Sequence, residues 1–109
     1  MHEVALMDGI LDEVSARVGE RRVALVHLEI GELAGVSSDA LRFCFELCAT
    51  TPPFVDAKLE IETIGGAARC NICGVELAMP MLGTPCSCGS FDRSITRGRE
   101  LRLAFVEVI

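Results

Sequence analysis

The chain has 109 residues, half of them hydrophobic, and it contains no Trp or Tyr. This length and composition predict one small domain with an aliphatic core, or a small domain that carries a metal-stabilised module. The 16 acidic and 10 basic residues give a net charge of -6. That charge argues against a general nucleic-acid binder, because phosphate contacts need a basic face.

The sequence offers no candidate for membrane insertion or secretion. No apolar run approaches the roughly 20 residues that cross a bilayer. The first residues lack the basic start of a signal peptide, and Asp8 and Asp12 interrupt the apolar positions there. We therefore expect a cytoplasmic protein without a membrane partner, in a compartment where thiols stay reduced and favour metals over disulfides.

The N-terminal part of the chain predicts a helix followed by a strand. Residues 3–18 place apolar side chains at helical spacing, and Gly19 suits the C-cap of this helix. Residues 22–30 alternate between an apolar face and a more polar face, as a half-buried strand does.

The remaining regular segments are a second helix and two strands. Residues 37–39 offer Ser and Asp as N-caps for a helix over 40–49, which ends before Pro52-Pro53. Residues 58–64 and 100–109 have the character of strands.

These segments predict an α+β fold: a small mixed or antiparallel sheet with two helices, plus an inserted module like a zinc ribbon. We expect one α/β domain built from residues 1–65 and 98–109, and a metal module over 66–97. Gly65-Gly66 has the composition of a hinge between them.

Four cysteines in the second half of the chain form its strongest motif. They are arranged as Cys70-x-x-Cys73 and Cys86-x-Cys88. Two turns that each present two thiolates suit Zn²⁺, which binds four thiolates tetrahedrally in structural sites and then has no open position for catalysis. The second pair is one residue shorter than the usual spacing, which predicts a strained turn at Cys86.

Two other interpretations of these cysteines are open. Cys70 and Cys73 could form a redox dithiol, although no strand-to-helix context of the thioredoxin kind surrounds them. Alternatively, the four side chains could be buried free thiols that pack as small hydrophobes.

The N-terminus carries a second metal-binding pattern. The Met1 amine, the His2 imidazole and the backbone nitrogens of His2 and Glu3 can together offer one ion a planar set of nitrogen ligands. Such a set favours Ni(II) or Cu(II) over zinc. Considered alone, a histidine at position 2 is more often a frayed surface residue.

The two patterns together, with several segments between and after them, resemble the HypA/HybF family of hydrogenase-maturation nickel metallochaperones. The resemblance covers essentially the whole chain in order. The matching segments are Met1-His2-Glu3, Val26-x-Leu28-x-Ile30-Gly31-Glu32-Leu33, Leu41-Arg42-Phe43-Cys44-Phe45-Glu46, Leu59-x-Ile61, the four cysteines, Cys88-Gly89-Ser90 and Gly98-Arg99-Glu100-Leu101-Arg102.

The resemblance implies two metals and a set of partners. It makes His2 the essential nickel ligand, with Met1 and the backbone nitrogens, and it makes Glu3 a neighbour that tunes binding or transfer. It implies a structural zinc on the four cysteines. Nickel would pass to [NiFe]-hydrogenase, or to urease in some organisms, through a hydrogenase-maturation GTPase, with the hydrogenase large subunit as a further partner.

The chain departs from this family at one place. The family has Cys-Pro-x-Cys-Gly where this chain has Pro85-Cys86-Ser87-Cys88-Gly89. The following Gly-Ser aligns Cys88, so Cys86 is displaced by one residue.

Several other polar residues are expected to be structural. Cys44 and Cys48 share the apolar stripe of the second helix and should pack in the core. His27 should be a surface or partly buried histidine of a strand, and Glu60 and Glu62 the solvated face of another strand.

No catalytic triad, phosphate loop or metalloprotease motif is present, so we expect no catalytic residues. Two rival functions stay open. One is a zinc-ribbon module for protein interaction with an incidental His2, and the other is a thiol-redox protein that uses Cys70 and Cys73. The long terminal strand and the sheet edges would permit a homodimer.

Overall fold

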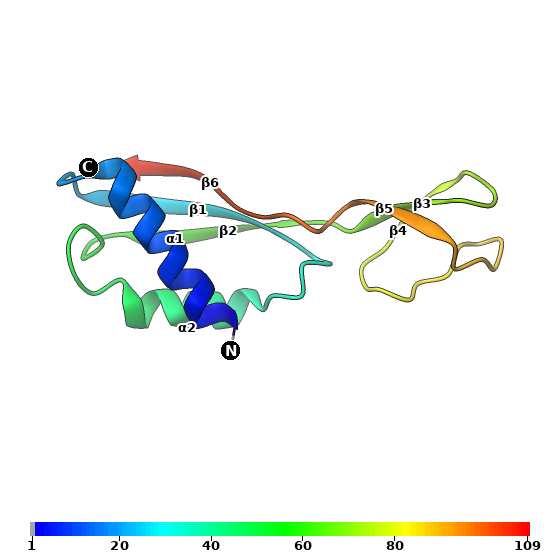
Figure 1. Ribbon diagram of the computed structural model, residues 1–109, viewed down its shortest axis with the longest axis horizontal. Helices are drawn as coiled ribbons and strands as arrows, with labels where there is room; N and C mark the ends of the chain where they lie inside the picture. Colours follow the sequence, from blue (N-terminus) through cyan, green and yellow to red (C-terminus); the bar gives the residue numbers. More distant parts are fainter. Residues whose placement is uncertain (1) are drawn as a thin grey trace. The chain divides into compact units, whose positions relative to one another are not determined.

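The structure, a computed structural model, describes residues 2–109, with only the backbone described at His2. Figure 1 shows the order of its elements. The two helices are α1 (His2–Val18) and α2 (Ser38–Cys48), and the six strands are β1 (Val23–Gly31), β2 (Lys58–Ile64), β3 (Ala67–Cys70), β4 (Glu76–Ala78), β5 (Arg93–Arg97) and β6 (Leu101–Val108). The expected α+β class with two helices and a four-cysteine module is confirmed.

The strands form two three-stranded sheets, in the orders β2-β1-β6 and β4-β3-β5. Within the first sheet β6 runs antiparallel to β1, because Ile109 N–H donates to the Arg22 carbonyl while Gly31 N–H donates to the Glu100 carbonyl. β1, α2 and β2 form a crossover unit of the kind that joins parallel strands. The second sheet is antiparallel throughout.

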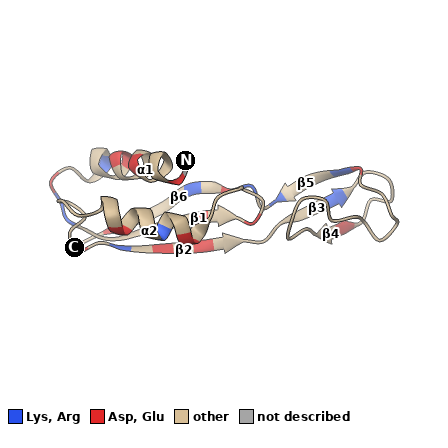
Figure 2. Cartoon of the chain, turned by 90° about the horizontal axis from the view of Figure 1, so that it is seen from below, with Lys and Arg blue, Asp and Glu red and all other residues tan. Residues whose placement is uncertain are grey.

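The chain divides into two compact units. The α/β unit consists of Met1–Leu28, Val36–Glu62 and Arg102–Ile109, and the cysteine unit consists of Glu29–Gly35 and Thr63–Leu101. Figure 2 shows acidic residues on α1, α2 and β2 of the α/β unit and arginines on β3 and β5 of the cysteine unit. No helix in the described part of the chain is both long and apolar enough to span a bilayer.

The core of the α/β unit is built from the helical stripes that the sequence predicts. Alternate residues of β1 are also buried, whereas His27 between them is only partly so. One face of the strand therefore faces the helices. The buried core residues of this unit include Met7, Leu11, Val14, Val18, Val23, Val26, Leu28, Leu41, Cys44, Phe45 and Phe54.

The second helix begins as its sequence predicts. Ser37 is its N-cap, and the Ser37 hydroxyl accepts the N–H of Ala40 at 3.1 Å. Asp39 lies in the first turn, where a negative charge is favourable against the helix dipole. This places Asp39 in the structural role expected of it.

Three glycines meet inside the cysteine unit, where backbones approach too closely for a side chain. A Cβ on Gly31 would collide with the carbonyl group of Gly98. A Cβ on Gly98, whose φ is +109°, would lie 2.6 Å from the Cα of Gly66. Gly66 itself is buried, and its N–H donates to Oε1 of Glu32 at 2.8 Å. Gly66 is therefore a close-packing glycine, and Gly65-Gly66 is not simply a flexible linker.

Candidate metal centre

The four predicted cysteines meet in the cysteine unit with geometry that suits a metal. Their sulfur atoms all lie within 4.8 Å of one another. Cys70 Sγ lies 3.7 Å from Cys88 Sγ, and Cys73 Sγ lies 3.5 Å from Cys86 Sγ. Zn–S bonds of about 2.3 Å in a tetrahedron separate the sulfurs by about 3.8 Å. The sulfur spacing therefore fits zinc.

The two cysteine pairs are in contact with each other through their sulfur atoms. Cys70 contacts Cys88, and Cys73 contacts Cys86. All four are free thiols. Because each thiol of one pair contacts a thiol of the other, the four sulfurs form a single cluster, as a shared ion requires.

The turns around the two cysteine pairs use the same hydrogen bonds. In the first, Cys70 N–H donates to the Val75 carbonyl at 2.9 Å and Gly74 N–H donates to the Cys70 carbonyl at 3.0 Å. In the second, Cys86 N–H donates to the Ser90 carbonyl at 2.9 Å and Gly89 N–H donates to the Cys86 carbonyl at 2.8 Å. The second turn is one residue shorter but is closed in the same way.

A glycine follows each cysteine pair and takes up the sharpest part of its turn. Gly74 and Gly89 take positive φ values of 79° and 87° at equivalent places after their cysteine pairs. Among the described residues, every residue with positive φ is a glycine. Each turn therefore places its positive φ on a glycine, where such a φ costs little.

The environment splits the pKa values of the four thiols. The N–H groups of Cys73 and Ile72 lower the pKa of Cys70 to about 6, and the Cys73 N–H lies 3.5 Å from Cys70 Sγ. The Cys88 N–H lowers the pKa of Cys86. One thiol of each pair is thereby biased toward the thiolate that binds metal.

The other two thiols hold their protons more tightly. At Cys88 the Ser90 N–H lowers the pKa, but hydrogen bonds with Cys70 and Cys86 outweigh it and raise the pKa to about 11. At Cys73 the Val75 N–H also lowers the pKa, and the contact with Cys86 and burial outweigh it. Each close sulfur contact thus pairs a readily ionised thiol with one that keeps its proton.

The N-terminal pattern falls partly outside the described residues. Met1 is not described, and neither is the side chain of His2. Glu3 is described: it is half-buried in the first turn of α1, and its Oε2 accepts the N–H of Ser37 at 3.5 Å. The carboxylate of Glu3 is therefore directed at the N-cap of α2.

The residues to which we assign structural roles lie in the α/β unit. Cys44 is buried in the core, as expected. Cys48 is half-buried, and burial together with a hydrogen bond to Asp8 raises its pKa, which keeps the thiol protonated.

Two glutamates expected only to form a solvated strand face contact a histidine. His27 is partly buried as predicted, but its two ring nitrogens lie 2.7 Å from Oε1 of Glu60 and 3.2 Å from Oε1 of Glu62. Its ring also stacks on Phe105, with centroids 4.5 Å apart. The glutamates are solvent-exposed, yet they hold a histidine on the neighbouring strand.

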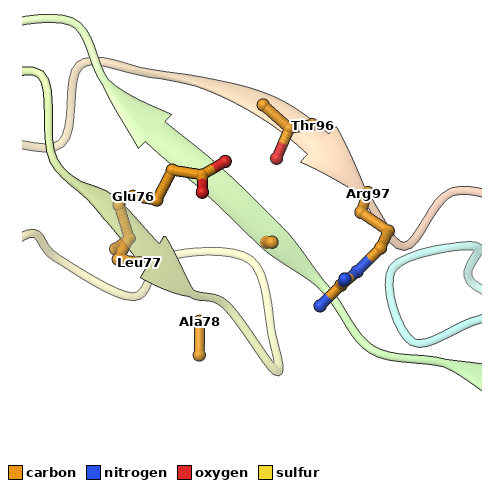
Figure 3. Close-up of a pocket in the computed structure, with 6 residues that line it drawn as sticks. Glu76, Leu77, Ala78, Thr96 and Arg97 are labelled. Atoms are coloured by element: carbon orange, nitrogen blue, oxygen red, sulfur yellow. The ribbon is translucent and has the colours of Figure 1, made fainter.

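A shallow hollow of about 430 Å³ lies on the second sheet and is separate from the thiol cluster. Figure 3 shows Glu76 of β4 and Thr96 and Arg97 of β5 around it. The guanidinium of Arg97 is already engaged, since its Nε donates to the Gly65 carbonyl at 3.0 Å. None of the four cysteines lines this hollow, so it is not part of the metal centre.

Comparison with known proteins identifies the family to which this fold and thiol cluster belong. Residues 1–108 match the family described as "Hydrogenase/urease nickel incorporation, metallochaperone, hypA". The chain belongs to the HypA family. Members of this family are nickel metallochaperones for the maturation of hydrogenase and urease, and they are not enzymes.

Individual HypA proteins match along almost their whole length. The hydrogenase maturation factor HypA of Geotalea uraniireducens is 38% identical over 109 residues, covering 99% of both chains. A protein called hydrogenase maturation factor HypA 2, from Bradyrhizobium diazoefficiens, is 39% identical over 112 residues, again with 99% of both chains.

Solved structures show the same fold. The solution structure of the Ni metallochaperone HypA from Helicobacter pylori aligns with a TM-score of 0.66 and 23% sequence identity. The alignment covers 100% of this chain and 98% of the Helicobacter chain. At this identity the likeness supports the HypA fold and no further property.

Proposed function

We propose that this chain binds Ni(II) at its N-terminus and delivers it to hydrogenase maturation, while a structural zinc on its four cysteines holds the cysteine unit together. The family match over residues 1–108 supports the delivery of nickel to hydrogenase maturation. The sulfur cluster supports the structural zinc.

The zinc role rests on the thiol geometry. Cys70, Cys73, Cys86 and Cys88 offer four soft ligands at tetrahedral spacing. A bound zinc would cross-link two turns that are joined by a long loop. Because four thiolates fill its coordination shell, it would supply structure and no Lewis-acid chemistry.

The nickel role rests on the residue types at the start of the chain. The Met1 amine, the His2 imidazole and the backbone nitrogens of His2 and Glu3 form a nitrogen-rich set that suits Ni(II). The first N–H groups of a helix have no acceptor inside the helix, so an ion can displace their protons without breaking it. The contact of Glu3 with Ser37 supports a defined position for this turn.

Nickel would leave by ligand exchange on docking to a partner. We propose the hydrogenase-maturation GTPase as the immediate partner, in the cytoplasm, and the hydrogenase large subunit as a later one. Mixing the nickel-loaded protein with that GTPase, and following nickel by mass spectrometry, tests the transfer step.

Calorimetric nickel titration of zinc-loaded protein tests the proposed binding site. His2→Ala and a form extended by a few residues before Met1 should both lose the tight site. His27→Gln is the matched control, since it removes the other histidine and should bind nickel as the wild type does. Equal nickel binding by all four proteins would contradict the proposal.

A further inference from the structure

Asn71, the residue between Cys70 and Ile72 in the first turn, forms three hydrogen bonds to one distant segment. Its Nδ2 donates to Oδ1 of Asp92 at 2.9 Å, and its backbone N–H donates to the Asp92 carbonyl at 2.9 Å. Its Oδ1 accepts the hydroxyl of Ser94 at 3.1 Å. An amide side chain can donate and accept at once, so Asn71 satisfies both neighbours.

The same segment is tied to the second cysteine pair. Asp92 N–H donates to the Ser90 hydroxyl at 3.0 Å. The Ser90 carbonyl in turn accepts the N–H of Cys86 at 2.9 Å. A continuous path of hydrogen bonds therefore runs from Asn71, beside Cys70, through Asp92 and Ser90 to Cys86.

Besides this path and the contacts between the thiols themselves, residues 74–85 and the sheet pairing connect the two turns. Residues 74–85 include an exposed stretch with Met81, Leu82 and Gly83 at its tip. The pairing of β3 with β5 ends at Cys70 and Arg93, so the first cysteine turn lies beyond the last paired residues. Asn71 and Asp92 follow directly on the last pair, and Ser94 lies one pair inside it.

We propose that Asn71 and Asp92 are positioning residues that hold the two cysteine turns at metal-binding distance. This role rests on the zinc site proposed above. Groups outside the ligands that orient a metal site affect how strongly it holds the metal. Asn71 and Asp92 are both exposed, so their removal should affect zinc release more than the fold.

The test measures the rate at which zinc passes from the intact protein to a chromophoric chelator. Asn71→Ala and Asp92→Ala should each release zinc about 10-fold faster than the wild type. The double variant should be no faster than Asn71→Ala alone, because Asp92→Ala breaks no side-chain bond that Asn71→Ala has not already broken. Asp92→Asn keeps an oxygen that can accept from Asn71, and should restore nearly the wild-type rate.

Two further variants separate positioning from general loss of structure. Thr84→Ala removes a hydroxyl that donates to the Met81 carbonyl at 2.9 Å within one loop, and it should release zinc at the wild-type rate. Ser94→Ala breaks one of the three bonds of Asn71 and should give an intermediate rate. Amide protection in the α/β unit should be unchanged in every variant.

The possible failures are distinguishable. If the wild type holds one zinc but Asn71→Ala releases it at the wild-type rate, or the two alanine effects multiply, the positioning role is wrong and the zinc site stands. If the wild type cannot be loaded with stoichiometric zinc, the zinc site is wrong and the positioning role falls with it.

Discussion

Nδ1 of His27 on β1 lies 2.7 Å from Oε1 of Glu60 on β2. The hydrogen bond to Glu60 raises the pKa of His27 above its usual 6.5; partial burial opposes the shift, and Glu62 adds to it. The side chain of His27 is only 14% exposed, so the charged ring is held mainly by these two carboxylates.

This arrangement predicts a pH-dependent contribution to stability. Because the folded pKa of His27 is raised, its contribution is fully present below pH 6.5 and is lost as the pH rises through the folded pKa. Glu60→Gln should lower the His27 pKa, measured by NMR titration of the ring protons, and should lower it more than Glu62→Gln does. Glu46→Gln, a change on α2, should leave it unaltered. If Glu60→Gln leaves the pKa of His27 unchanged, the hydrogen bond to Glu60 is not the cause of the raised pKa.

The shortened cysteine pair gives a second prediction. Since the turn at Cys86 is closed by the same hydrogen bonds as the turn at Cys70, Cys86→Ser should reduce bound zinc as severely as Cys70→Ser. The measurement is the metal-to-protein ratio after reconstitution. Cys48→Ser is the control, because it replaces a free thiol of α2 that lies outside the cluster. This variant should retain one zinc. Full zinc in Cys86→Ser would show that Cys86 is not a ligand.

Removal of zinc should affect the two units unequally. Chelation should expose the amides of β3, β4 and β5 to hydrogen exchange, because β3 carries Cys70 and both other strands pair with it. The amides around Val14 and Leu41 should stay protected, since the α/β unit has its own buried core. Hydrogen exchange read by mass spectrometry resolves these segments, and a uniform loss of protection would contradict the prediction.

Glycine-to-alanine changes should have opposite signs in the two units. Gly31→Ala would place a Cβ against the Gly98 carbonyl group and should destabilise the protein by at least about 2 kcal/mol. Gly9→Ala lies in α1 with open space around the new methyl group and should stabilise it by about 0.5–1 kcal/mol. Urea unfolding of both variants measures the difference, and a harmless Gly31→Ala would mean that the close approach is absent.

Two leucines of α2 test the assignment of its buried face. Leu41 is 0% exposed and Leu47 is 60% exposed. Leu41→Ala should cost about 2–5 kcal/mol of unfolding free energy, whereas Leu47→Ala should change it by about 0.5 kcal/mol or less. Urea unfolding measures both variants. Similar losses of unfolding free energy would show that the buried face of α2 is assigned wrongly.

The sequence predicts those parts of the fold whose residues repeat at a regular period. The stripe through Met7, Leu11 and Val14 predicts α1, and the alternation in β1 identifies which side chains are buried, because both patterns are local. The approach of His27 to Glu60 depends on how β1 aligns with β2, and no local pattern fixes that alignment.

The cysteine site shows a similar division. The type and spacing of the thiols predict their meeting, since four soft ligands in a short segment have few other uses. The hydrogen bonds of Asn71 join irregular loops without periodicity, so they are visible only in the structure. The positive φ of Gly89, just after the second pair, is likewise not fixed by the spacing of the cysteines.

The cysteine unit includes a piece of chain that precedes its own cysteines by more than thirty residues. Glu29–Gly35 belongs to that unit, and through Gly31 and Glu32 it contacts Gly98 and Gly66. A fragment cut as residues 66–97 would lack this segment. Exchanging the cysteine unit between relatives would therefore require moving both of its segments, Glu29–Gly35 and Thr63–Leu101, together. A natural recombination event confined to one segment would combine glycine contacts from two different proteins.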